Sequence, residues 1–192
     1  MLGFADETWW SRFAQPQAHT WVDEAAGGPL RLVEQEAPRG DPDPKTLACY
    51  GVLLRQVNQP ERVWLRFVDG RPVSAITEQF LAWCCRRLQE AGVRVWVLIW
   101  DNASWHVSKR VRAWIQAHNR QVKRARQGVR ILSCYLPVKS PWLNPIEPKW
   151  VHGKRAILEP TRLLSAQEVA DRVCAHFGCS HDPHLAIPDK AA

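Results

Sequence analysis

Three acidic residues stand at the edges of expected regular elements, where their side chains could carry out chemistry. Asp6 follows a short apolar strand at residues 2–5. Asp101 follows the apolar run 93–100, and Glu147 lies in the first turn of an expected helix. Carboxylate oxygens are the ligands that Mg²⁺ prefers, and two such ions can clamp the attacking and leaving oxygens of a phosphoryl transfer. The three residues are therefore candidates for a metal-dependent active site.

Each of these residues also has a simpler interpretation. Asp101 could cap the helix that follows it, and Asp6 or its neighbour Glu7 could be a solvated strand end. Glu147 lies three residues after Asn144, so it could serve only in a capping box. Residue type and position alone leave these alternatives open.

The distribution of charge favours a partner that carries phosphates. The chain has 192 residues and a formal net charge of +7, yet no Asp or Glu lies between Asp101 and Glu147. That stretch holds nine basic residues: Lys109, Arg110, Arg112, Arg120, Lys123, Arg124, Arg126, Arg130 and Lys139. A merely solvated helix would intersperse acids for pairing along its surface, whereas a uniformly basic segment suits nucleic acid. Lys149 and Lys154 continue this character, and we expect DNA contacts from Lys109, Arg110, Arg112, Lys123, Arg124, Lys139, Lys149 and Lys154.

Length and composition indicate one domain over residues 1–179, followed by a frayed tail at 180–192. The chain has neither an apolar run of membrane-spanning length nor a signal pattern, so a cytoplasmic protein is expected. Its six Cys are scattered and are expected to be free thiols.

The order of elements predicts an α/β fold. Expected strands cover residues 2–5, 46–54, 62–68, 93–100 and 129–136, with weak ones at 19–22 and 30–33. Expected helices cover residues 74–91, 108–126, a third opening at 144, and 165–177. Antiparallel strands followed by alternating helices and strands predict a mixed sheet with helices on both faces. The apolar strand 93–100 is expected to be buried on both sides.

Two motifs carry a resemblance to a known family. The first is Ile99-Trp100-Asp101-Asn102-Ala103 with His106, and the second runs from Ser140 to Trp150 as SPWLNPIEPKW. Together they resemble the catalytic half of a DDE-type transposase, nearest to the bacterial insertion-sequence branch of the mariner superfamily. The resemblance extends from Phe4 to about Cys179.

The resemblance implies an RNase H-like fold, with a mixed five-stranded sheet flanked by helices. It implies a catalytic and metal-binding triad of Asp6, Asp101 and Glu147, holding two Mg²⁺ or Mn²⁺ ions. It also implies that metal-activated water hydrolyses a phosphodiester at the element end, and that the freed 3′-hydroxyl then attacks target DNA. Asn102, His106 and Glu7 are expected to support the site.

The resemblance further implies transposon ends and target DNA as partners, a homodimer, and a bacterial, nucleoid-associated protein. The interval from Asp101 to Glu147 is longer than the family pattern, with the excess around 121–128. The family also carries a helix-turn-helix region before the catalytic part, so a separately encoded helix-turn-helix subunit is expected. Two alternatives remain: an inactive fragment that only binds DNA or another subunit, and an RNase H-like nuclease or resolvase without strand transfer.

Other residues suggest weaker hypotheses. The cluster of Cys174, His176, Cys179, His181 and His184 could bind zinc, although its spacing fits no common zinc module.

Trp105 and Trp142 adjoin the two motifs and could stack on an unpaired base. Ser104 lies near His106, but without a nucleophile-elbow pattern a Ser/His/Asp hydrolase is unsupported.

Overall fold

The computed structural model describes residues 1–14, 35–157, 159 and 161–187, and the elements below are those of this part of the chain. The expected weak strands at 19–22 and 30–33 lie outside it. The strands are β1 (Leu2–Ser11), β2 (Thr46–Arg55), β3 (Arg62–Val68), β4 (Val95–Trp100) and β5 (Arg130–Tyr135). The helices are α1 (Ser74–Glu90), α2 (Lys109–Ala125), the short 3₁₀ helix η2 (Pro141–Leu143), α3 (Glu147–Ala156) and α4 (Ala166–Phe177).

The strands form one mixed sheet in the order β3-β2-β1-β4-β5. β1 pairs antiparallel with β2, and β2 pairs antiparallel with β3. β1 pairs parallel with β4, and β4 pairs parallel with β5. The expected five-stranded mixed sheet is therefore confirmed.

Helices cover both faces of the sheet, as expected. α1 and α2 pack on one face, where buried residues such as Phe80, Trp96 and Val111 form the larger core. α3 and α4 pack on the other face, where Trp10 and Trp150 lie in a second core. Side chains alternate between the two faces along each strand, so neighbouring residues of one strand serve different layers.

The first strand is longer than the sequence indicated. It continues to Ser11 because all ten residues from Leu2 to Ser11 pair with β2 and because Trp10 is fully buried. The prediction that Asp6 follows the strand is therefore wrong: Asp6 lies inside β1, opposite Gly51 of β2.

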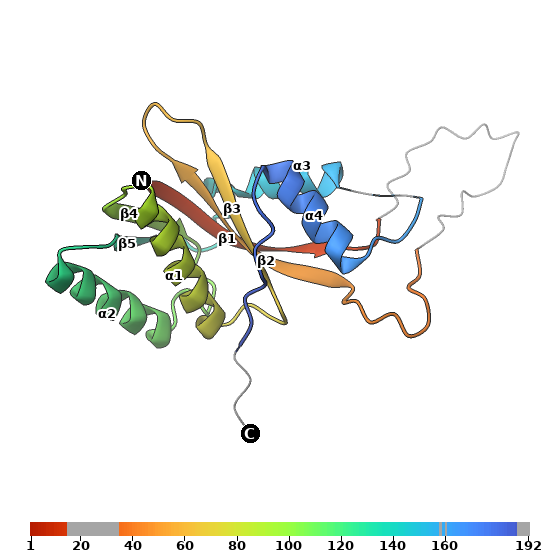
Figure 1. Ribbon diagram of the computed structural model, residues 1–192, viewed down its shortest axis with the longest axis horizontal. Coiled ribbons are helices and arrows are strands. Elements are labelled where there is room, and N and C mark those ends of the chain that lie inside the picture. The colour runs from red at the N-terminus through yellow and green to blue at the C-terminus, as the bar shows by residue number, and fades with distance from the viewer. Residues whose placement is uncertain (15–34, 158, 160, 188–192) are drawn as a thin grey trace, which may run out of the picture.

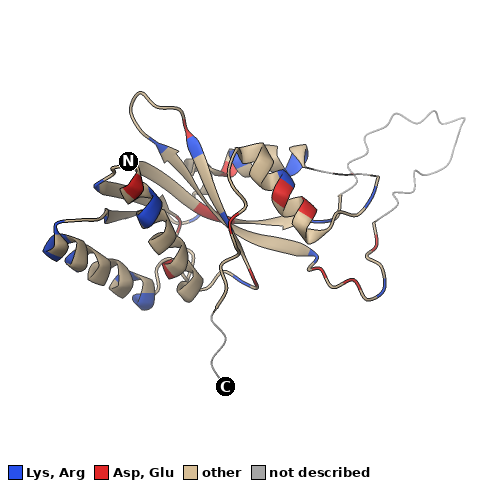
Figure 2. Ribbon diagram, in the orientation of Figure 1, with Lys and Arg blue, Asp and Glu red and all other residues tan. Residues whose placement is uncertain are grey.

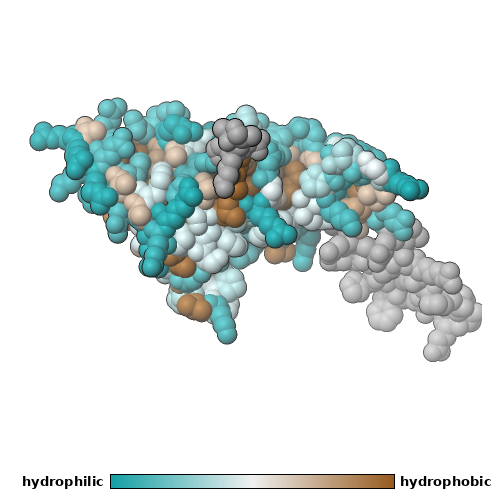
Figure 3. Space-filling view, turned by 90° about the horizontal axis from the view of Figure 1, so that it is seen from below, coloured by the Kyte–Doolittle hydropathy of each residue, from teal (hydrophilic) through white to brown (hydrophobic). Residues whose placement is uncertain are grey.

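The burial expected for the central apolar run was also wrong. β4 begins at Val95, and only Trp96, Leu98 and Trp100 are buried, while Val95 is 40% exposed. The reason is that α3 and α4 pack over β1, β2 and β3, so the second face of β4 is only partly covered. Figure 3 shows one face of the molecule, where hydrophobic residues form separate patches among hydrophilic ones.

The C-terminal segment is more ordered than expected. A frayed tail was wrong for residues 180–187, because Leu185 is buried and forms a parallel bridge with Val68 at the end of β3.

The six cysteines are free thiols, as expected. Among the described residues, none of the helices has the length and apolar composition needed to cross a membrane.

Candidate active site

The parallel pairing of β1 and β4 brings Asp6 and Asp101 to the same level of the sheet. The printed register pairs Phe4 with Ile99. Two residues further along each strand come Asp6 and Asp101, which alternation places on the α3 and α4 face. Two carboxylates from distant parts of the sequence thus emerge on neighbouring strands at the carboxyl end of β4, the position where α/β sheets hold their ligands.

Glu147 reaches the same place from the first turn of α3. Asp6, Asp101 and Glu147 all line one pocket of about 340 Å³. The rest of its wall comes from Asn102, Ala103, Leu136, Pro137, Val138, Lys139, Ser140, Pro141 and Asn144. Three elements that are far apart in sequence therefore converge on one cavity through their acidic side chains.

The surroundings of Asp6 are buried and short of positive charge. Asp6 is 9% exposed, and its Oδ2 accepts a hydrogen bond of 2.9 Å from the indole Nε1 of Trp150. Burial, followed by the negative charges of Glu7 and Glu147, raises the pKa of Asp6 to about 7. A carboxylate held in this way gains strongly from a nearby cation.

Space for the Trp150 ring comes from a glycine. A Cβ added at Gly51, the residue paired with Asp6, would lie 2.2 Å from a ring carbon of Trp150. Only a residue without a side chain lets the indole lie against the sheet and reach the Asp6 carboxylate.

The surroundings of Asp101 are different. Its side chain is 50% exposed, and its Oδ1 lies 2.7 Å from Nδ1 of His106 and accepts a 3.0 Å hydrogen bond from the backbone N–H of Ala103. The hydrogen bond from His106 is the largest cause that lowers the pKa of Asp101. The capping interpretation of Asp101 does not hold, because Ser108 is the residue that caps α2.

His106 is fixed between two carboxylates. It is 1% exposed, its ring stacks on Trp100 at 4.5 Å, and its Nε2 lies 2.7 Å from Oε1 of Glu7. Trp105 Nε1 donates to the same Glu7 oxygen at 3.0 Å. Burial by itself lowers the pKa of His106, but Glu7 and then Asp101 outweigh it and raise the pKa to about 9. Glu7 therefore lies on the opposite face of β1 from Asp6 and reaches the site through His106.

Glu147 does not act as a cap. The N-cap residue of α3 is Ile146, without a side-chain cap, and the described residues offer the Glu147 carboxylate no hydrogen bond that would make a capping box. Burial is the largest cause that raises the pKa of Glu147, with Lys154 opposing it and Asp101 adding to it. Asn144, which was expected to begin this helix, is instead buried and donates to the carbonyl of Ala5 at 3.1 Å.

Asn102 connects two strand ends beside the site. Its Nδ2 donates to the carbonyl of Leu136 at 2.6 Å, just beyond β5.

The eight basic residues expected to contact DNA fall into separate groups. Lys139 lines the pocket itself, and Lys154 lies close enough to act on Glu147. Arg110 and Lys149 form ion pairs with Glu78 at 2.8 Å and Glu61 at 3.1 Å.

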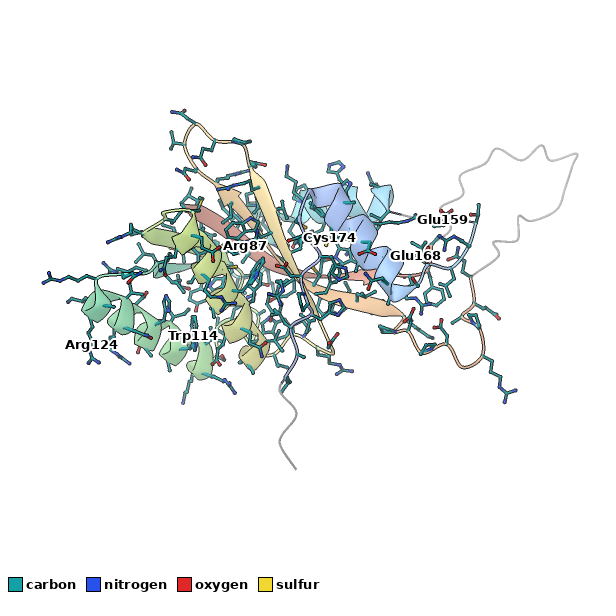
Figure 4. All side chains as sticks on the ribbon, viewed as in Figure 1. Arg87, Trp114, Arg124, Glu159, Glu168 and Cys174 are labelled. Atoms are coloured by element: carbon teal, nitrogen blue, oxygen red, sulfur yellow. The ribbon has the colours of Figure 1, made fainter. Side chains whose placement is uncertain are left out.

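The other four lie along α2. Lys109, Arg112, Lys123 and Arg124 are exposed, and Figure 2 shows basic residues toward both ends of this helix and no acidic residue on it. Lys123 and Arg124 are in the last turn, about 20 Å along the axis from Lys109. Figure 4 places Arg124 at the outer end of α2.

The weaker hypotheses have different outcomes in the described residues. Trp105 is committed to its hydrogen bond with Glu7, whereas Trp142 is 74% exposed beside the pocket.

The proposed five-residue zinc cluster does not assemble as a whole. Cys174 is buried on α4, His176 is exposed, and only His181 and His184 bring ring nitrogens together.

The pocket fits hard divalent cations by the chemistry of its donors. Asp6, Asp101 and Glu147 supply only oxygens, and the raised pKa values of Asp6 and Glu147 reflect negative charge gathered in a partly dry site. As arranged here, no three His, Cys, Asp or Glu side chains of the described chain close on a single ion position. The carboxylates thus share a cavity without meeting at one point.

Sequence reasoning missed two residues of the site. Trp150 carried a weak signal, because its position three residues after Glu147 places both on one face of the helix. The role of Gly51 had no signal, because it follows from the pairing register of β1 and β2.

Comparison with known proteins identifies the family. A sequence model described as DDE superfamily endonuclease matches residues 45–169, well over half of the chain. The chain belongs to this family. The matched range includes Asp101 and Glu147, while Asp6 precedes it. No curated protein sequence matches the chain.

Solved structures agree on the fold. A Mos1 transposase paired-end complex with the left transposon end aligns with TM-score 0.64 and 17% identity, over 94% of this chain and 48% of that one. A Mos1 mariner paired-end complex with Mn aligns with TM-score 0.63 and 17% identity, over 94% and 49%. The Mos1 strand transfer complex aligns with TM-score 0.61 and 16% identity, over 93% and 47%. This chain therefore spans about half the length of the Mos1 chains, and the expected fold of a DDE-type transposase catalytic domain is confirmed.

Proposed function

We propose that this chain is the catalytic domain of an insertion-sequence transposase that cleaves DNA and joins the freed 3′ end to a target. The observation that carries the proposal is the convergence of Asp6, Asp101 and Glu147 on one pocket from β1, the end of β4 and α3. The chain belongs to an endonuclease family whose name fits that chemistry.

Asp6 and Asp101, on adjacent strands, together with Glu147 would hold two Mg²⁺ or Mn²⁺ ions. When bound, such ions activate the attacking oxygen and neutralise charge on the phosphodiester. Two of the Mos1 structures that align with this chain are described as complexes with Mn or with Mg, which is consistent with this choice of ion.

The protein's own residues orient the carboxylates. Trp150 fixes one oxygen of Asp6, and His106 fixes one oxygen of Asp101 and is itself held by Glu7. Each carboxylate keeps its other oxygen free of these contacts, so it can face the pocket. Asn102 supports the site less directly, by tying the segment after β4 to Leu136.

Two groups of basic residues would bind the DNA, one near the carboxylate pocket and one along α2. Lys139 lines the carboxylate pocket and Lys154 lies further along α3 from Glu147, and both would contact phosphates near the scissile bond. Lys109, Arg112, Lys123 and Arg124 along α2 would contact flanking duplex, and such contacts make binding fall with salt.

Arg110 and Lys149 would contribute less, because Glu78 and Glu61 already neutralise them.

The first test is metal-dependent nicking of a supercoiled plasmid by the wild-type chain and Asp101→Asn. We expect nicking with Mg²⁺ or Mn²⁺, none with EDTA, and a loss on the order of 10³-fold in Asp101→Asn, about 4 kcal/mol of transition-state stabilisation. Glu90→Gln is the matched control, because Glu90 is exposed at the end of α1 and does not line the pocket.

The other outcomes assign the chain to the alternatives. Nicking without strand transfer to a second DNA would indicate an RNase H-like nuclease or resolvase. DNA binding that falls steeply with salt, with no nicking by the wild type, would indicate an inactive binding module.

Partners complete the proposal. The Mos1 structures are described as transposon-end complexes, and they are about twice the length of this chain. We propose that this domain acts as a homodimer on DNA in the bacterial nucleoid, together with a helix-turn-helix segment that binds the transposon ends. Nicking assays with and without such a helix-turn-helix segment test that requirement.

A further inference from the structure

Residues 180–187 form a segment that pairs, through Leu185, with the end of β3. Leu185 N–H donates to the carbonyl of Phe67, and Asp69 N–H donates to the carbonyl of Leu185, each at 2.8 Å. Leu185 is 4% exposed, which anchors the segment in the core beneath α1. The two histidines of this segment are therefore held in place by backbone pairing beside them.

The histidines point their outer nitrogens at each other. Nε2 of His181 lies 3.3 Å from Nε2 of His184. On the other side of each ring, Nδ1 contacts a carboxylate: His181 meets Asp171 of α4 at 2.8 Å, and His184 meets Asp69 after β3 at 2.7 Å. Both rings pack against Phe67, with centroids 5.5 Å away.

The carboxylates decide where the ring protons are. A carboxylate only accepts hydrogen bonds, so each Nδ1 must carry a hydrogen, and a neutral ring then leaves a lone pair on Nε2. Gln167 Nε2 lies 3.2 Å from Nδ1 of His181, but it also donates to both oxygens of Asp171 at 3.0 Å. When both rings are neutral, two lone pairs thus face each other at 3.3 Å, and either a proton or a metal ion between the nitrogens would stabilise the arrangement.

The separation fits a metal ion better than a shared proton. Zinc binds imidazole nitrogen at about 2.0–2.1 Å, and tetrahedral angles then place two nitrogens about 3.3–3.4 Å apart. Protein N–H···O hydrogen bonds are about 2.7–3.2 Å long, so 3.3 Å is a long separation for a proton shared by the two nitrogens. Carboxylates on the far nitrogens are the usual second shell of metal-bound histidine, because they set the tautomer and raise ligand basicity.

We propose that His181 and His184 bind one Zn²⁺ ion through their Nε2 atoms, with Asp171 and Asp69 orienting the rings. Water completes the coordination, because no third His, Cys, Asp or Glu of the described chain joins the pair. The site ties α4 and the end of β3 to the segment between them. It is chemically distinct from the oxygen-only pocket of Asp6, since imidazole prefers zinc and carboxylate prefers magnesium.

Calorimetric titration of the full chain with Zn²⁺, in excess Mg²⁺ to occupy the oxygen-only pocket, tests the proposal. Wild type should bind one equivalent of Zn²⁺ that His181→Asn or His184→Asn removes. Asp69→Asn should weaken binding about 10- to 100-fold, as second-shell changes do. His176→Asn is the matched control, because this exposed histidine on the adjoining helix should leave binding unchanged.

A second measurement guards against misfolded variants. Zn²⁺ should raise the Tm of wild type but not of His184→Asn, and imidazole NMR signals of wild type should shift only for His181 and His184. Equal Zn²⁺ binding by wild type and His184→Asn would overturn the proposal. So would loss of binding in Cys179→Ser with His184→Asn intact, because the ligands would then be thiols.

Discussion

The two aspartates of the pocket have the same chemistry but opposite surroundings. Asp6 is buried, is held by the neutral indole of Trp150, and has a raised pKa. Asp101 is half exposed, is held by a histidine, and has a lowered pKa. One site therefore contains a carboxylate that needs an external cation and one that already has a cationic partner. The difference predicts that substitutions around Asp6 and substitutions around Asp101 change nicking in different ways.

The largest expected effect is the same for both aspartates. Asp6→Asn should abolish nicking as fully as Asp101→Asn, a loss on the order of 10³-fold, because either change removes one of the three charged ligands of the metal site. Plasmid nicking at saturating Mg²⁺ measures it. Near wild-type nicking by Asp6→Asn would remove Asp6 from the site, and it would agree with the family match beginning only at residue 45.

The next effect concerns the Asp101 side. His106→Asn should raise the Mg²⁺ concentration for half-maximal nicking about 10- to 100-fold, because His106 positions a metal ligand. The rate at saturating Mg²⁺ should fall much less.

Glu7→Gln keeps an oxygen that accepts from His106, so it should show a smaller shift in the same direction. A fall in maximal rate without any change in the Mg²⁺ requirement would mean that His106 is only structural.

A smaller effect is expected on the Asp6 side. Trp150→Phe keeps the ring but loses the donor, so nicking should fall about tenfold, in line with a hydrogen bond to a charged group. Gly51→Ala should displace the ring, adding about 1–3 kcal/mol of destabilisation from overpacking. Trp114→Phe on α2 is the control, because Trp114 stacks on His118 away from the carboxylates.

Full nicking by Trp150→Phe and Gly51→Ala would show that Asp6 needs no orienting partner. The two sides of the pocket would then differ more than their hydrogen bonds indicate.

The smallest expected effect concerns the basic side chains near the two aspartates and the salt dependence of DNA binding. Lys139→Ala and Lys154→Ala should each weaken DNA binding and reduce the slope of log affinity against log salt by about 0.9. Arg110→Ala should change the slope less, since Glu78 already pairs with Arg110. Fluorescence anisotropy across salt concentrations measures these slopes, and equal changes in all three variants would argue against local phosphate contacts at the pocket.

The sequence was sufficient for features that depend on local pattern and motif. The apolar period of residues 74–91 and the expected helix starts at residues 108 and 165 placed three helices to within two residues. The two motifs placed Asp101 and Glu147, and the structure adds that they line one pocket with Asp6.

The features that could not be predicted depend on long-range pairing. The strand around Asp6 was expected to end early because its own residues do not show that β2 offers ten pairing partners. Glu7 was expected to support the site, but its partner could not be named. The contact joins Glu7 to His106, which is 99 residues away in the sequence. The segment 180–187 was expected to fray because its own sequence does not show its partner. Leu185 pairs with Val68, at the end of a strand more than a hundred residues earlier.

The bridge between Leu185 and Val68 also bears on self-association. Exposed strand edges present unpaired N–H and C=O groups that can recruit a second sheet, and proteins commonly cover such edges. Here the chain covers the end of β3 near Val68 with its own backbone. β5, at the other edge of the sheet, has only six residues and begins with Arg130, and both features disfavour pairing with a second molecule. The same short segment that holds the histidine pair therefore removes the part of this sheet edge between Phe67 and Asp69 from pairing with a second molecule.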